Sequence, residues 1–125
     1  MLLDSNIIIY SVEPQNQQIR DLIAIEAPSV SEISYLEVLG FPRITPIQIQ
    51  LFSEFFASAP TLPIDRPILD RAVSLRQQQR MSLGDAIVAA TALVHDKTLV
   101  TRNTADFRWI TGLRLHDPFA TPPVP

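Results

Sequence analysis

Four acidic residues that stand at the edges of separate apolar runs constrain this chain more than any other feature. Asp4 ends the run 1–3, and Asp85 opens the run 86–94, in which Thr91 is the only polar residue. Burying a lone carboxylate costs far more free energy than its apolar neighbours return. Each carboxylate must therefore be capped, paired or bound to a metal ion. The four acids are Asp4, Glu37, Asp85 and Asp106.

Short apolar segments alternate with helical patterns along the chain. We expect strands at 2–4, 28–31, 99–101 and 113–115, a short extended piece at 60–63, and helices within 7–12, 34–40, 45–59, 66–80 and 82–94. Such alternation predicts an α/β fold with a mainly parallel sheet that is covered on both faces. The length of 125 residues suits one domain, which we place at 1–120. The proline-rich tail 121–125 is expected to fray.

Composition narrows the chemistry. No stretch reaches the roughly 20 apolar residues of a membrane span, and no signal peptide is recognisable, so we expect a soluble, cytoplasmic protein. The absence of cysteine excludes thiolate zinc sites, and a metal would be held mainly by oxygen. A net charge of −3 counts against a polyanionic substrate. Nine of the ten basic residues are arginine, however, and arginine suits phosphate.

The predicted fold brings the acids to one place. Ligands of parallel sheets bind at the carboxyl ends of the strands, where Asp4 and Asp106 are expected. Glu37 and Asp85 are expected in first helical turns that face the same edge. A plainer reading is that the acids only cap helices or close turns, because Glu37 and Asp85 each follow a serine at capping-box spacing: Ser34-x-x-Glu37 and Ser82-x-x-Asp85.

Four converging carboxylates would repel one another unless a cation neutralised them. Mg²⁺ or Mn²⁺ fits oxygen ligands best. One such ion, or two about 4 Å apart, supports phosphodiester hydrolysis. A haloacid-type phosphotransferase would need an aspartate at position 6, and Asn6 argues against it. The competing hypothesis is a binding module that keeps the fold without the chemistry.

Four motifs, in order, cover nearly the whole chain: 3–10, 34–38, 82–92 and 99–107. They resemble the successive motifs of the PIN domain family, and the VapC-type toxins are the nearest branch. The resemblance implies a Rossmann-like, three-layer α/β/α sandwich and a metal-dependent endoribonuclease that leaves a 5′-phosphate and a 3′-hydroxyl. It also implies a toxin that forms homodimers and pairs with an antitoxin that fills the active groove.

The same resemblance assigns roles by position. The catalytic and metal-binding acids would be Asp4, Glu37, Asp85 and Asp106, and the supporting residues would be Ser5, Asn6, Thr101 and Asn103. From their places near the acids, we predict that RNA phosphate is contacted by Arg43, Arg102 and Arg108. An apolar stripe is either core or a surface for self-association or antitoxin binding: Ile47, Leu51, Phe52, Phe55 and Phe56.

Overall fold

Five short parallel strands form the central sheet, in the order β3-β2-β1-β4-β5. They are β1 (Leu2–Leu3), β2 (Ser29–Ser31), β3 (Thr61–Leu62), β4 (Leu99–Val100) and β5 (Leu115–His116). The computed structural model describes residues 1–120, so the fraying predicted for 121–125 lies outside the described residues. β5 begins two residues later than predicted, because Leu113 still closes a turn through its N–H to the Ile110 carbonyl (3.4 Å).

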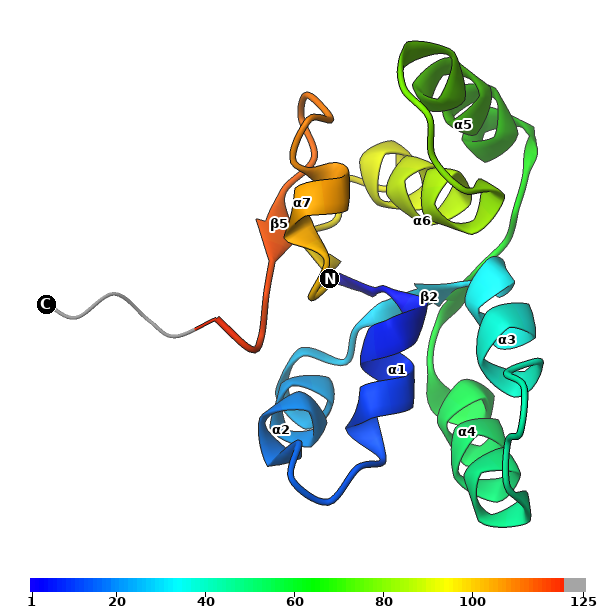
Figure 1. Cartoon of the computed structure of the whole chain (residues 1–125), viewed down its shortest axis with the longest axis vertical. Helices are drawn as coiled ribbons and strands as arrows, with labels where there is room; N and C mark the ends of the chain where they lie inside the picture. Colours follow the sequence, from blue (N-terminus) through cyan, green and yellow to red (C-terminus); the bar gives the residue numbers. More distant parts are fainter. Residues whose placement is uncertain (121–125) are drawn as a thin grey trace, which may run out of the picture.

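Helices cover both faces of this sheet. They are α1 (Ser5–Ser11), α2 (Gln17–Glu26), α3 (Glu32–Leu39), α4 (Pro46–Ser58), α5 (Arg66–Gln78), α6 (Leu83–Val94) and α7 (Thr104–Phe107). Figure 1 shows α5, α6 and α7 on one side of the strands and α1, α2 and α4 on the other, with α3 next to α4. The predicted three-layer α/β/α sandwich is therefore confirmed.

The helix α2 was not predicted, since no element was assigned between residues 13 and 27. Its signal is an apolar stripe at Ile19, Leu22 and Ile23, which is the i, i+3, i+4 spacing of an amphipathic helix. Asn16, its N-cap residue, forms no side-chain capping hydrogen bond, so the usual helix-start signal is weak.

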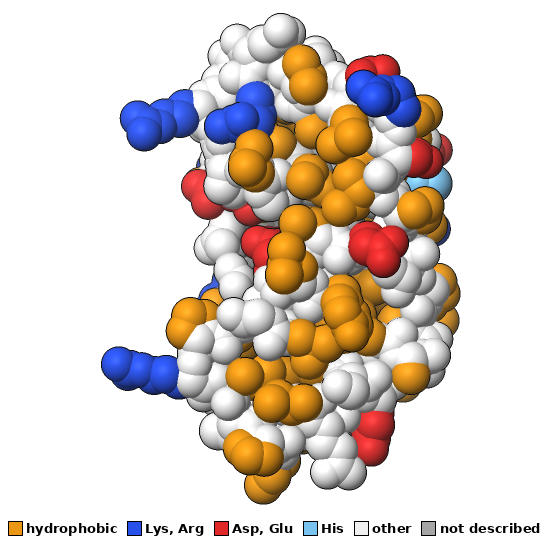
Figure 2. Space-filling view, turned by 90° about the vertical axis from the view of Figure 1, so that its right-hand side faces the viewer, with side chains coloured by type: hydrophobic (Ala, Val, Ile, Leu, Met, Phe, Trp, Pro, Cys, Tyr) orange, Lys and Arg blue, Asp and Glu red, His pale blue; other side chains and the backbone are white. Residues whose placement is uncertain are grey.

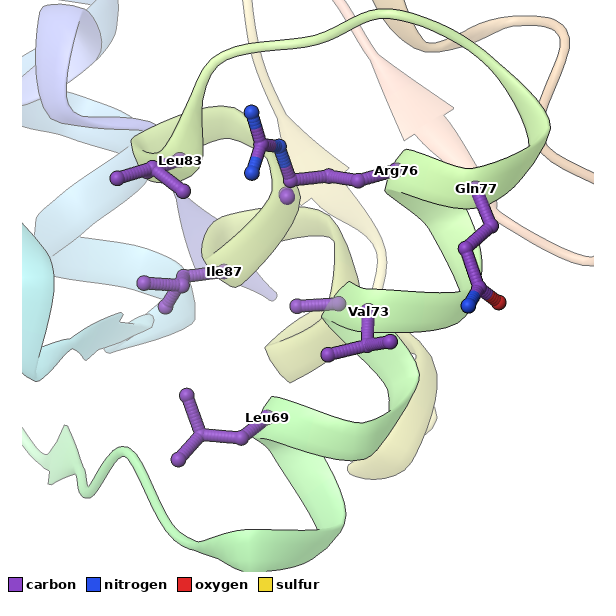
Figure 3. A pocket seen from close by; sticks show the side chains of 8 residues that line it. Leu69, Val73, Arg76, Gln77, Leu83 and Ile87 are labelled. Atoms are coloured by element: carbon purple, nitrogen blue, oxygen red, sulfur yellow. The ribbon is translucent and has the colours of Figure 1, made fainter.

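Hydrophobic side chains also gather on the outer surface, in a broad band over the face formed by α5, α3 and α4 (Figure 2). Part of this band is a groove of about 450 Å³ between α5 and α6. Figure 3 shows Leu69 and Val73 of α5 facing Leu83 and Ile87 of α6 across it. No helix within residues 1–120 is long and apolar enough to cross a membrane.

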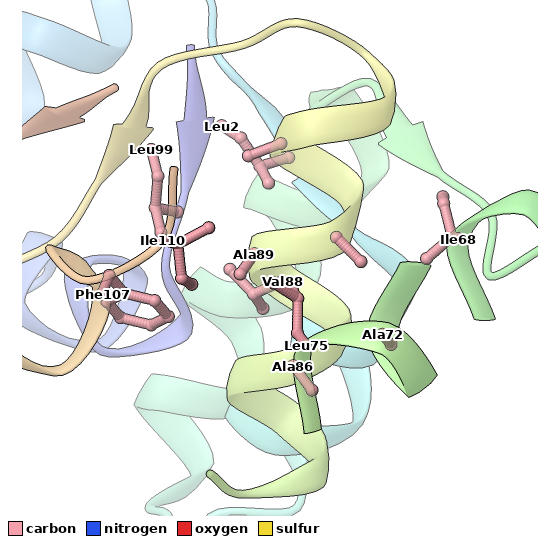
Figure 4. Packing of buried hydrophobic residues seen from close by; sticks show 12 residues of the cluster. Leu2, Ile68, Ala72, Leu75, Ala86, Val88, Ala89, Leu99, Phe107 and Ile110 are labelled. Atoms are coloured by element: carbon pink, nitrogen blue, oxygen red, sulfur yellow. The ribbon is translucent and has the colours of Figure 1, made fainter. Parts of the chain in front are cut away.

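Alternating side chains of the central strands build two cores, one on each face of the sheet. Leu2 and Leu99 join the core beneath α5 and α6, whereas Leu3 and Val100 join the core beneath α1 and α4. Figure 4 shows the first core, with the inner face of α6 lying against Leu2, Leu99 and Ile110. This face is rich in alanine, so α6 can approach the sheet closely. The close approach places the first turn of α6 near the end of β1.

Candidate functional site

The strand order reverses beside β1. From β1 the chain moves outward to β2 and β3, and it then returns to β4 on the other side of β1. Asp4 directly follows β1, and its N–H donates to the carbonyl of Val100 at the end of β4 (2.9 Å). Ligands of open parallel sheets bind at such a reversal, outside the carboxyl ends of the strands. Asp4 therefore stands at the edge that the sequence predicted.

Asp4 is fixed by its neighbours and is only 6% exposed. Its Oδ1 accepts from the backbone N–H of Ser5 (2.8 Å), which makes Asp4 the N-cap of α1. Its Oδ2 accepts from the hydroxyl of Thr101 (2.9 Å). Burial raises the pKa of Asp4 from 3.8 to about 6, and the charges of Asp85 and Glu37 add to the rise, although the hydrogen bonds from Thr101 and Ser5 oppose it.

Glu37 is tied to Asp4 through Ser5. The Ser5 hydroxyl donates to Oε1 of Glu37 (2.8 Å) and also lies 2.8 Å from the hydroxyl oxygen of Ser34. Because the single hydroxyl hydrogen of Ser5 goes to Glu37, the buried Ser34 must be the donor to Ser5. Glu37 itself remains largely exposed. The Ser5 hydroxyl thus holds one oxygen of the Glu37 carboxylate, and Ser34 in turn holds Ser5.

The capping box considered as an alternative at Ser34 does not form. α3 begins at Glu32, and its cap is Ser31, whose side chain accepts from the N–H of Ile33 (3.2 Å). β2 ends at Ser31, so the helix starts immediately after the strand, and Ser34 turns inward as a buried bridge. Glu37 consequently lies in the second turn of α3 and not, as predicted, in its first.

Asp85 does lie in the first turn of α6, where Ser82 caps the helix by accepting from the N–H of Asp85 (3.1 Å). Burial raises the pKa of Asp85; the Ser82 hydroxyl opposes the rise, and the charges of Asp106 and Glu37 reinforce it. Gly84 precedes Asp85 and packs against Glu37, since a Cβ at Gly84 would lie 2.6 Å from Oε2 of Glu37. A glycine here lets α6 and the Glu37 carboxylate approach each other.

Asp106 is exposed in the short helix α7. It shares a cavity of about 270 Å³ with Asp85, and the segment between α5 and α6 helps to line this cavity through Gln79, Arg80 and Met81. The indole N–H of Trp109 donates to the backbone carbonyl of Asp106 (3.0 Å). The four acids thus form two pairs at one sheet edge, and charge repulsion couples Asp85 to Glu37 across the pairs.

The side chains do not, as they stand, form a closed metal cage. Within the described range, no three Asp, Glu or His side chains are close enough together to hold an ion. The chemistry of the donors nevertheless suits a hard cation, since all four are carboxylates whose mutual repulsion a cation would relieve. Asp106 is exposed and its carboxylate has no hydrogen bond within residues 1–120, so its side chain has room to turn toward an ion.

The predicted supporting residues divide into two groups. Ser5 and Thr101 touch the acids directly, and the backbone N–H of Asn103 donates to the Thr101 hydroxyl (3.1 Å). Asn6 is exposed, and across residues 1–120 its side chain forms no hydrogen bond to the acids. The sequence assigned no site role to Ser34 or Gly84; a glycine in the first turn of an apolar helix was the one available signal.

All three predicted phosphate-binding arginines are exposed: Arg43, Arg102 and Arg108. None neutralises an acid of the site, because the only ion pair in the described part of the chain joins Arg114 and Asp96 (2.8 Å). The apolar stripe is split between its two readings. Phe52 and Phe56 belong to the core, whereas Ile47 and Leu51 are 71% and 41% exposed.

Comparisons with known proteins agree with this architecture. The PIN domain family model matches residues 1–112. A toxin-antitoxin complex from Klebsiella pneumoniae is similar, at 31% identity and a TM-score of 0.77, over 96% of this chain and 98% of that chain. DNA-bound VapBC from Salmonella typhimurium shares the fold at 19% identity and a TM-score of 0.82, over 94% of this chain and 96% of that chain. FitAcB from Neisseria gonorrhoeae shares it at 23% identity and a TM-score of 0.75, over 96% of this chain and 99% of that chain. No curated protein sequence matches the chain.

Proposed function

Because this chain belongs to the PIN domain family, we propose that it is a metal-dependent endoribonuclease and the toxin of a toxin–antitoxin pair. The observation that carries this proposal is the gathering of Asp4, Glu37, Asp85 and Asp106 where the strand order reverses, with no ion pair to neutralise them within residues 1–120. Its substrate would be cytoplasmic RNA.

We assign the binding of Mg²⁺ or Mn²⁺ to these four carboxylates, which offer only oxygen ligands. When bound, such an ion supplies stabilisation of the negative charge on the phosphate oxygens and promotes ionisation of water. Ser5 and Thr101 hold the Asp4 carboxylate in a fixed orientation. Ser34 donates to Ser5, which donates to Glu37, and this Ser34–Ser5 relay holds the Glu37 carboxylate. Asp85 and Asp106 border the adjoining cavity, where a phosphate group has room to lie.

Cleavage of labelled RNA by the antitoxin-free protein tests the activity. We expect discrete products with Mn²⁺ that disappear with EDTA and in Asp4→Asn, and that end in a 5′-phosphate and a 3′-hydroxyl. Asp70→Asn, on the exposed face of α5, is the matched control and should cleave normally. Undiminished cleavage by Asp4→Asn would overturn the mechanism.

Metal binding can be tested apart from activity, because Trp109 is the only tryptophan and bonds to the Asp106 carbonyl. Paramagnetic Mn²⁺ bound to the carboxylates should quench Trp109 fluorescence, and Mg²⁺ should compete without quenching. The quench should weaken strongly in Asp85→Asn and persist in Asp70→Asn. The stoichiometry of the titration counts the ions.

One observation favours a second candidate, a PIN-fold binding module without catalysis: within the described residues no three acids are close enough to hold an ion as they stand. In that case the acids would serve as caps and polar contacts. Mn²⁺ would then neither quench Trp109 nor raise the melting temperature of the protein, whereas a true site is stabilised by its ligand.

We further propose an antitoxin partner and a homodimer. The Klebsiella pneumoniae relative is a toxin-antitoxin complex, which supports the partner. A groove of about 420 Å³ between α2 and α4 offers an apolar surface at Val12, Ile23, Leu51 and Phe55. If the protein encoded by a neighbouring short reading frame co-purifies with this chain, and Leu51→Asp abolishes the co-purification, this surface is supported.

The homodimer is tested separately. A stable monomer at micromolar concentration would count against it.

A further inference from the structure

Arg102 lies in a corner made by two aromatic rings. Its guanidinium carbon is 4.3 Å from the ring centroid of Phe119 and 5.6 Å from that of Tyr10. The two rings are nearly perpendicular, at 87°, with centroids 5.6 Å apart. Tyr10 comes from the last turns of α1 and Phe119 from the segment after β5, so three distant parts of the chain build this aromatic corner.

Contact with the two rings is the only interaction of the Arg102 guanidinium within the described part of the chain. The guanidinium takes part in no hydrogen bond and no ion pair there. Cation–π attraction to two rings restricts the side chain while leaving its N–H donors unused. The residue is exposed, and its guanidinium lies over the ring of Phe119.

The aromatic corner stands next to the candidate site. Thr101, which donates to Asp4, immediately precedes Arg102, and consecutive Cα atoms are about 3.8 Å apart. Tyr10 follows Asp4 by six residues, or about 9 Å along α1. A strand of RNA whose phosphate lay beside the acids would therefore pass close to this corner.

We propose that the aromatic corner of Arg102, Phe119 and Tyr10 binds an unpaired nucleobase beside the phosphate that is cleaved. This inference rests on the proposed ribonuclease function and adds to it a position at which one unpaired base of the substrate is held. Unpaired bases stack on guanidinium planes and aromatic rings, and the free N–H groups of Arg102 can donate to phosphate or base oxygens. A base held in a duplex cannot leave its own stack to do so.

A structural clamp on the C-terminal segment is the competing explanation, and substitution separates the two. Arg102→Leu still covers the rings but removes the planar cation. We expect it to weaken the binding of a labelled single-stranded RNA of about ten nucleotides by roughly 5- to 150-fold, measured by fluorescence anisotropy in EDTA. Arg71→Leu, which removes another exposed arginine, from α5, is the control and should bind almost as well as wild type.

Two further measurements locate the base. Moving one abasic nucleotide along the RNA should weaken wild-type binding most at a single position, and that position should lose its effect in Arg102→Leu and in Phe119→Leu. A fully paired duplex should bind more weakly than the single strand. Equal binding by Arg102→Leu and Arg71→Leu, or no abasic position that matters, would overturn the inference.

The proposed function fails separately from this inference. If wild type does not cleave RNA with Mn²⁺, the nuclease proposal is lost whatever Arg102 binds. If wild type cleaves, and Arg102→Leu keeps the wild-type KM and RNA affinity, only the base-binding corner is overturned.

Discussion

The two halves of the acidic site are built differently. Asp4 is buried and accepts two hydrogen bonds, and Glu37 receives a third through the Ser34–Ser5 relay. Asp106 is exposed beside an open cavity, and within residues 1–120 no hydrogen bond holds its carboxylate. Asp85 is half-buried between the two halves, and its negative charge is repelled by Asp4 and Glu37 on one side and by Asp106 on the other.

This difference shows which part of the site is set by folding alone. The sheet and the serine relay fix Asp4 and Glu37 without any ligand, whereas Asp106 keeps the freedom to adjust. A site that is fixed on one side and adjustable on the other does not need a finished cage before an ion arrives. The absence of a three-acid group in the described residues is consistent with such a site.

The comparison predicts unequal catalytic losses, and this is the largest expected effect. Asp4→Asn should reduce RNA cleavage by about 10³-fold, or about 4 kcal/mol of transition-state stabilisation, because a fixed ligand has no substitute. Asp106→Asn should reduce cleavage less, by about 10²-fold. Asp106 is exposed, so neighbouring oxygen atoms can take the place of its carboxylate. Cleavage rates under saturating Mn²⁺ measure both. Equal losses would remove the distinction between the halves.

Stability against pH should also separate the halves. With its pKa raised from 3.8 to about 6, folded Asp4 binds its proton more tightly than unfolded Asp4 does. The metal-free protein should therefore lose stability as pH rises from about 4 to about 6, and then level off, at a cost of about 3 kcal/mol. Asp4→Asn should restore most of this lost stability at pH 8 and should change the stability little at pH 4.

Urea unfolding in EDTA at several pH values measures this effect. Asp106→Asn is the exposed control and should change the free energy of unfolding by less than about 0.5 kcal/mol at each pH. A stability of the wild-type protein that stays level between pH 4 and pH 6 would contradict the assignment of Asp4 as a costly buried carboxylate.

Removal of the Ser34–Ser5 relay should lower the stability of the protein less than the ionisation of Asp4 does. Ser34→Ala deletes a buried hydrogen bond to Ser5 and should lower the free energy of unfolding by about 1 kcal/mol. It should also weaken Mn²⁺ quenching of Trp109, because Glu37 is then held less firmly. Ser53→Ala, on the exposed face of α4, is the matched control and should leave both measurements unchanged.

The smallest effect on stability is expected at Gly84. A methyl group there would displace only the end of the Glu37 side chain, while alanine favours the helix by up to about 1 kcal/mol. Gly84→Ala should therefore leave stability nearly unchanged yet reduce Mn²⁺ affinity. Wild-type affinity in this variant would mean that Glu37 is not placed by its contact with α6.

The fold could be predicted from the sequence to a large extent, because strand and helix patterns are local. The edge position of Asp4 and the first-turn position of Asp85 followed from such patterns. The partners of the acids could not be predicted, because Ser34 meets Ser5 over 29 residues and Thr101 meets Asp4 over 97. Capping-box spacing favoured Ser34 over Ser31, because only Ser34 has a glutamate three residues later.

The bond between Thr101 and Asp4 also has a consequence for the timing of synthesis. β1 pairs with β4, so the candidate site is completed only after nearly the whole domain has left the ribosome. A nascent chain that ends before β4 has three of the four acids but not the strand that orients the first one. If the chain is the toxin that we propose, its nuclease activity would appear only at the end of translation, when a partner made beforehand could already be present to bind it.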